Sequence, residues 1–130
     1  MPDPRQLMRD LQVFRDPQPG RSLWELGITL IPFLGLFAAI IAAADAGYLL
    51  ALALTPLAGL FLLRLFIIQH DCGHGAFFAG KRANDRVGAV LGVMTLTPYA
   101  VWKKAHARHH ATSGNLARRG TGDIDTYTVA

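Results

Sequence analysis

Hydrophobic residues along this chain are gathered into two long blocks with polar segments outside them. Residues Leu26 to Ala44 carry no charge, and this run is long enough to cross a hydrocarbon core about 30 Å thick as a helix. Tyr48 to Ile68 form a second apolar block, with Arg64 as its single charge. Only residues 45–47 separate the blocks. The pattern predicts a transmembrane helical hairpin with spans at 24–44 and 48–68.

Two features of these blocks leave room for another interpretation. Arg64 would be costly at the bilayer centre, but it lies near the end of its block, where its stem can reach the interface. Ala42-Ala43-Ala44 is similar to a signal-peptide cleavage site. The first apolar run exceeds the usual signal core of roughly 7–15 residues, and a second span follows at once, so we expect an uncleaved hairpin.

The remaining segments are shorter or polar. Residues 87–101 form a third apolar stretch, and a helix of this length would be only about 22 Å long. We therefore expect an interfacial or re-entrant segment at 87–101. In residues 1–21, Leu7, Leu11 and Phe14 fall at helical spacing, which fits either a surface helix or a disordered tail. Residues 111–130 have the composition of a loop.

Charge and composition narrow the class of protein. The net charge is +4, and the basic residues flank the apolar blocks while the short turn has none, so both ends should be cytoplasmic. The sequence disfavours nucleic acid as a partner, because no zinc-finger pattern or basic face interleaved with aromatics occurs. Cys72 is the only cysteine, which excludes an internal disulfide and disfavours a cysteine-ligated iron–sulfur cluster. The expected fold is an all-α integral membrane protein, in which residues 69–130 form a cytoplasmic region.

All five histidines fall in two clusters, which are the candidate chemistry of the chain. His70 and His74 follow the second span, whereas His106, His109 and His110 follow the third apolar stretch. On a helix, residues four apart share a face, so each cluster can present two imidazoles to one metal ion, and the cluster of three can reach a second ion. Imidazole suits iron, zinc, copper and nickel. The two clusters can share a site only if residues 87–101 do not cross the membrane.

Two common metal chemistries do not fit these clusters. A zinc peptidase of the His-Glu-x-x-His type needs a glutamate as its base, but the spacing here is His-x-x-x-His and Asp71 follows the first histidine. Carboxylate-bridged di-iron bundles need several glutamates, and Glu25 is the only one in the chain. A histidine-rich metal site at a membrane surface remains.

The histidine segments resemble the membrane-bound fatty acid desaturase family. His70-Asp71-Cys72-Gly73-His74, followed by Gly-Ala-Phe-Phe, is similar to the first histidine box of that family. Trp102-Lys-Lys-Ala-His106-Ala-Arg-His109-His110-Ala-Thr-Ser-Gly-Asn115 resembles the second box, and its continuation, Arg118-Arg-Gly-Thr-Gly-Asp123-Ile, resembles acyl-lipid desaturases of the Δ12 (ω6) type. The resemblance covers residues 65–130 well and the hairpin in layout only.

This resemblance implies a reaction and its cofactors. It implies a di-iron site with His70, His74, His106, His109 and His110 among the ligands, O₂ as co-substrate and the acyl chains of membrane lipids as substrate. A ferredoxin or a cytochrome b5-type protein would supply the electrons, and a bacterial inner membrane is the expected location. The family has a third box after a second pair of spans, which this chain lacks, so we expect a truncated chain that is inactive alone.

Several other residues have functional and structural interpretations. Asp71 could hydrogen-bond a ligand imidazole and so fix its orientation, as could Asp123 or Asp125 from the loop. Cys72 is expected to pack beside the site, and Gly73 to let another helix approach closely. The basic residues of the second box could bind lipid phosphates or an acidic electron donor, or could simply mark the cytoplasmic flank; they are Lys103, Lys104 and Arg108.

Two other functions remain open. One is a related di-iron hydroxylase or ketolase that acts on a lipid or carotenoid. The other is a non-enzymatic membrane fragment that binds metal.

Overall fold

The computed structural model describes residues 3–12 and 16–115, and within these ranges the regular structure is entirely helical. The all-α prediction is therefore confirmed. The helices follow one another in the order α1 (Pro4–Gln12), α2 (Pro19–Ala46), α3 (Tyr48–His74), α4 (Lys81–Met94) and α5 (Tyr99–Thr112).

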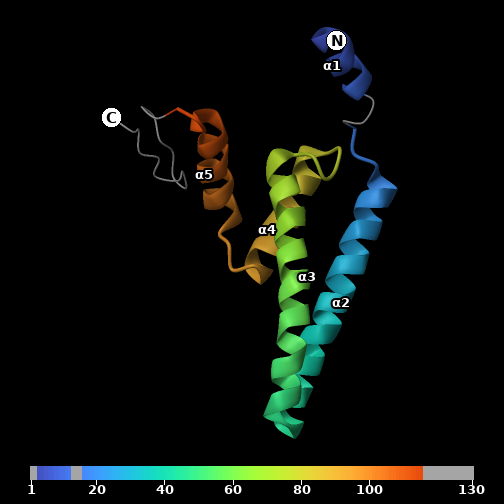
Figure 1. Cartoon of the computed structure of the whole chain (residues 1–130), viewed down its shortest axis with the longest axis vertical. Helices are drawn as coiled ribbons and strands as arrows, with labels where there is room; N and C mark the ends of the chain where they lie inside the picture. The colour runs from blue at the N-terminus through green and yellow to red at the C-terminus, as the bar shows by residue number, and fades with distance from the viewer. Residues whose placement is uncertain (1–2, 13–15, 116–130) are drawn as a thin grey trace.

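The long helices α2 and α3 form an antiparallel pair (Figure 1). Both contain a stretch that is long and apolar enough to cross a membrane, at Pro19–Asp45 and Ala51–His74. Only 17% of the most apolar window of α2 and 22% of that of α3 are buried in the protein. A core helix of a soluble protein would bury most of such a window, so these faces fit contact with lipid instead. This is the hairpin that the two apolar blocks predict.

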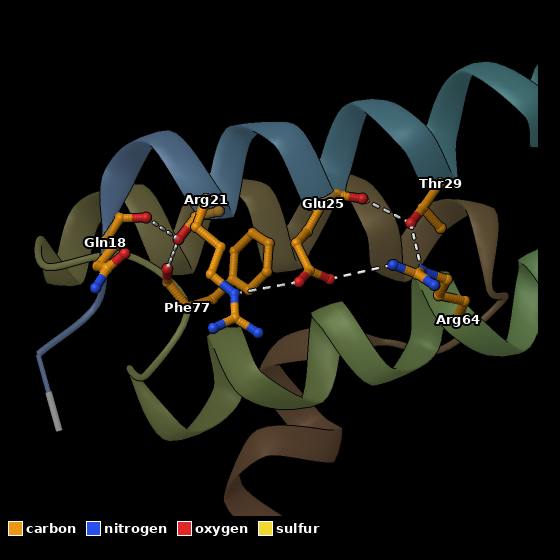
Figure 2. Close-up of polar contacts among 7 residues, drawn as sticks. Gln18, Arg21, Glu25, Thr29, Arg64 and Phe77 are labelled. Carbon is orange, nitrogen blue, oxygen red and sulfur yellow. Dashed lines mark hydrogen bonds and ion pairs between the residues drawn. The ribbon is translucent and has the colours of Figure 1, made fainter. Parts of the chain in front are cut away.

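A network of hydrogen bonds and ion pairs joins the two spans near one end of the hairpin (Figure 2). The Arg64 guanidinium on α3 donates from Nε to Thr29 Oγ1 at 2.8 Å, and its Nη2 lies 3.1 Å from Glu25 Oε2 on α2. Arg21 pairs with the other oxygen of Glu25 at 3.4 Å. The position of Arg64 near the end of its block was expected to lower its cost, and two partners on α2 lower it further, because they hydrogen-bond the guanidinium.

The apolar stretch 87–101, which we expected to form an interfacial or re-entrant segment, is divided between two helices. Its first half ends α4 at Met94, and its second half begins α5 at Tyr99. Pro98 lacks an N–H and disfavours helix in the residue before it, so the chain reverses at residues 95–98. At this reversal Leu96 has a φ of 54° and an exposed side chain. α4 therefore runs away from the His74 end of α3, and after the reversal α5 runs back toward that end (Figure 1).

A small core holds α4 and α5 on the hairpin. It consists of Phe33 from α2, Leu65, Ile68 and Cys72 from α3, Leu91 from α4 and Tyr99 from α5. Cys72 is fully buried here, as the packing role predicted. The link from α3 to α4 begins at Gly75, whose φ of 71° is the left-handed conformation that glycine adopts without strain. The core thus packs the beginning of α5, at Tyr99 and Trp102, against the second half of α3.

Candidate metal centre

Four imidazoles from two helices meet at the end of the hairpin. His70 and His74 occupy the last turns of α3, while His106 and His110 lie one turn apart on α5. His74 Nε2 lies 3.3 Å from His70 Nε2 and 3.1 Å from His106 Nε2, and His110 Nε2 lies 3.0 Å from His106 Nε2. One potential ligand atom from each ring lies within 4.8 Å of the other three. The two clusters therefore form one site.

The spacing of these nitrogens fits a shared metal ion. Two imidazole nitrogens bound about 2.1 Å from one ion are about 3.0 Å apart at right angles and about 3.4 Å apart at the tetrahedral angle. The three close pairs, at 3.0–3.3 Å, fall in this range. A cation would satisfy the converging lone pairs together, whereas hydrogen bonds between neutral rings satisfy them only in pairs. No carboxylate belongs to this four-atom group among the described residues.

The surroundings of His106 favour the form of imidazole that binds metal. Burial lowers the pKa of His106, and repulsion from His70, His110, His74 and His109 lowers it further. A ring that releases its proton more easily is neutral over a wider pH range, and metals bind the neutral ring. His106 and His70 are half-buried, whereas His74 and His110 are exposed. The site is therefore open on one side.

His109 and Asp71 lie near the four clustered histidines but do not belong to the group of four converging ligand atoms. The His109 ring is stacked against that of His106, with centroids 6.1 Å apart, and it lies outside the four-atom group. Asp71 Oδ1 lies 3.3 Å from His70 Nδ1, which is the nitrogen that the cluster does not use. That contact fits a carboxylate that fixes the His70 tautomer. The ligand role of His109 and the orienting role of Asp71 stay predictions, and Asp123 and Asp125 lie outside the described residues.

The basic residues of the second box divide into two groups. Lys103 Nζ lies 2.7 Å from Asp85 Oδ1, and Lys81 holds the other oxygen of the same carboxylate at 2.7 Å. Hydrogen bonds from Lys103 and Lys81 lower the pKa of Asp85 to about 2. Lys103 thus ties α5 to α4. Lys104 and Arg108 are exposed and remain available for lipid phosphate or for an acidic partner.

The sequence motif alone assigns no role to Trp102. Its indole stacks on His106 at 4.8 Å and tilts against His70 at 5.9 Å. The sequence spacing could have indicated the contact with His106, because residues four apart, such as Trp102 and His106, share one face of a helix. Gly73 lies against this ring, so the predicted close approach at Gly73 is confirmed. The contact of Trp102 with α3 depends on tertiary packing, which the spacing alone does not give.

Fold and site together define a helical membrane protein with a histidine cluster that fits a metal ion. Residues 46–130 match the model of the fatty acid desaturase family, and the chain belongs to that family. It is 49% identical, over 96% of its own length, to a fatty acid desaturase from Bacillus subtilis. The resemblance in the two histidine boxes is therefore confirmed.

Other relatives match shorter segments. The chain is 40% identical over 58 residues to a ferredoxin-type sn-1 acyl-lipid omega-3 desaturase from Synechocystis, and 43% identical over 60 residues to an oleoyl-12-hydroxylase from Ricinus communis. These matches cover 45% and 46% of this chain and 16% of each relative. Δ12 desaturases are also among the relatives. The chain spans 36% of the length of the Bacillus subtilis protein. None of the solved structures matches it.

Proposed function

We propose that this chain provides the membrane hairpin and the first two histidine boxes of an iron- and O₂-dependent acyl-lipid desaturase. The observation that carries the proposal is the convergence of four Nε2 atoms from the two boxes, whose first members, His70 and His106, are 36 residues apart in the sequence. The close pairs, at 3.0–3.3 Å, suit shared metal coordination. A donor set of imidazoles without carboxylates suits iron, among other ions. Membership of the family favours iron and favours a second ion, with His109 among its ligands.

The reaction that we propose removes two hydrogens from adjacent carbons of an unactivated acyl chain. O₂ accepts these two hydrogens together with two electrons from a donor and two protons from the solvent, which gives a double bond and two molecules of water. The di-iron centre, when bound, supplies the oxidising chemistry. The Synechocystis relative is named as a ferredoxin desaturase, which supports a donor of the ferredoxin type, and a cytochrome b5-type protein is the alternative.

We infer that this chemistry takes place at the membrane surface. We infer that α2 and α3 span the bilayer and that His70 and His74 leave it at the cytoplasmic side, because the basic residues flank the hairpin and its turn has none. The reversal at residues 95–98 carries exposed Leu96 and hydrogen-bonds to α3, where Thr95 Oγ1 donates to Gln69 Oε1 at 2.6 Å. This arrangement supports a re-entrant α4–α5 pair, and the similarity to the Bacillus subtilis desaturase supports a bacterial membrane.

A hydroxylase is the second candidate, because the Ricinus communis relative carries that name at a similar identity. Both reactions begin from an acyl chain, and hydroxylation leaves an oxygen on the carbon where desaturation leaves a double bond. The chain matches relatives of both kinds, so analysis of the acyl products is needed to distinguish desaturation from hydroxylation. Chain length, double-bond position and head group are settled by the same measurement. Metal binding without catalysis remains the alternative from another class.

A chimaera with the Bacillus subtilis relative tests the proposal. Residues 1–130 replace the matching segment of that protein, in a host that lacks Δ12 activity and expresses a ferredoxin and its reductase. We expect new unsaturated acyl chains in the lipid profile, and we expect none from the matched His106→Ala chimaera. Residues 1–130 expressed alone should give none either. Hydroxylated products would favour the second candidate, and a stable chimaera without any acyl product would contradict both.

A further inference from the structure

The indole of Trp102 lies between the two histidine boxes and touches both helices. Its ring is nearly parallel to His106, at an interplanar angle of 13°, and it meets Phe66 of α3 edge-on with centroids 5.7 Å apart. A Cβ atom added at Gly73 would lie 2.8 Å from Trp102 Cζ3 and 3.2 Å from Cη2. The outer edge of the indole therefore fills the space that the missing side chain of Gly73 leaves on α3.

We propose that Gly73 and Trp102 form a spacer that sets the distance between the two histidine boxes, with Trp102 as a positioning residue for His106 and His70. The inference rests on the proposed metal function. Stacked and tilted aromatic contacts restrict ring orientation, so the indole holds the His106 plane while it limits the tilt of His70. Neither Gly73 nor Trp102 binds the metal.

The consequence of filling this space can be worked out from the distances. Carbon atoms pack at about 3.5–4.0 Å, so a methyl group at position 73 would push the indole outward by about 0.7–1.2 Å. Because Trp102 and His106 share one face of α5, the His106 ring would move with it. The Nε2 atoms of His74 and His106, now 3.1 Å apart, would separate to about 4 Å. That exceeds the roughly 3.4 Å that one ion permits at the tetrahedral angle.

The experiment measures Co²⁺ binding by the 130-residue chain in lipid nanodiscs, through the visible absorption of the bound ion and through the emission of Trp102. The chain has two tryptophans, so Trp24→Phe leaves Trp102 as the sole indole. Gly73→Ala is compared with Gly59→Ala, a matched control on the same helix where a Cβ would meet nothing within 4 Å. Circular dichroism and gel filtration verify that every variant is folded and monodisperse.

We expect Gly73→Ala to weaken Co²⁺ binding by about 10- to 100-fold and Gly59→Ala to leave it unchanged. Trp102→Phe removes the outer ring that carries Cζ3 and Cη2, so the double variant Gly73→Ala/Trp102→Phe should bind as well as Trp102→Phe alone. A merely structural defect at Gly73 would not be rescued in this way. Equal binding by the two glycine variants, or a double variant without recovery, overturns the spacer.

The proposed function fails separately from the spacer. If the unaltered chain binds no Co²⁺, or if His106→Ala binds it equally well, the metal site is wrong and the spacer falls with it. If the unaltered chain binds Co²⁺, His106→Ala does not, and Gly73→Ala behaves as Gly59→Ala, the metal site stands and only the spacer is overturned.

Discussion

Asn84 holds the link between the first histidine box and α4, and its replacement gives a measurable loss of stability. The side chain is 1% exposed. Its Oδ1 accepts from the Phe78 N–H at 3.0 Å, and its Nδ2 donates to the carbonyls of Phe78 at 2.6 Å and Gly80 at 3.1 Å. The same link is tied to α2, because Ser22 Oγ donates to the Phe77 carbonyl. Loss of Asn84 should loosen residues 75–80 and, through them, α4.

The three hydrogen bonds set the magnitude of this effect. At a net value of about 0.5–1.5 kcal/mol each, Asn84→Ala would lose about 1.5–4.5 kcal/mol. Gly80 is exposed and Phe78 is only half-buried, so water can replace part of the loss. We therefore expect about 1.5–3 kcal/mol. Asn84→Asp keeps the acceptor but turns an oxygen toward two carbonyl oxygens, so it should destabilise at least as much as Asn84→Ala.

The assay is unfolding in mixed micelles with increasing dodecyl sulfate, followed by Trp102 emission in the Trp24→Phe background. Arg82→Ala, at an exposed position of the same helix, is the control and should change the free energy of unfolding by less than about 0.5 kcal/mol. If Asn84→Ala behaves like this control, or if Asn84→Asp is as stable as the unaltered chain, the account of the link is wrong.

Three further predictions concern the helix contacts and the ligands. The pKa of Asp85 is lowered to about 2 in the folded protein. The stability that its ion pairs contribute is therefore complete above its ordinary pKa near 4 and is lost as the pH falls toward 2. In a pH titration followed by Trp102 emission, Asp85→Asn should remove this loss of stability in acid. Arg64→Met should destabilise the hairpin toward dodecyl sulfate by about 0.6 kcal/mol, and by no more than about 1.7 kcal/mol, because two contacts to α2 are lost. In the 130-residue chain, Co²⁺ titration should show about tenfold weaker binding for His110→Ala and less than threefold for His109→Ala, since only His110 belongs to the four-atom group.

The apolar blocks and the histidine spacing were enough to predict the hairpin and the meeting of the two boxes. Block length fixes whether a helix can span, and a stretch of 15 residues could not separate the clusters. The division of that stretch at residues 95–98 was missed, although Pro98 marks it. Hydrophobicity alone does not separate one short apolar segment from two helix ends joined by a reversal.

Contacts between distant residues were beyond the reach of sequence patterns. Glu25 and Arg64 are 39 residues apart, and Asp85 and Lys103 are 18 apart, so their pairing depends on how the helices pack. The spacer at Gly73 is similar in kind, because a glycine in a helix has several structural explanations. Only the position of Trp102 on the neighbouring helix selects one of them.

The most direct test of the central claim is X-ray absorption at the iron edge of the 130-residue chain loaded anaerobically with Fe²⁺ in nanodiscs. The account predicts specifically bound iron with a first shell of nitrogen or oxygen atoms near 2.1 Å and the outer-shell scattering that imidazole rings give. Compared with the unaltered chain, His106→Ala should lose most of that iron, and Gly59→Ala should keep it. Iron without imidazole scattering, or iron that His106→Ala retains in full, would contradict a metal centre built from the two histidine boxes.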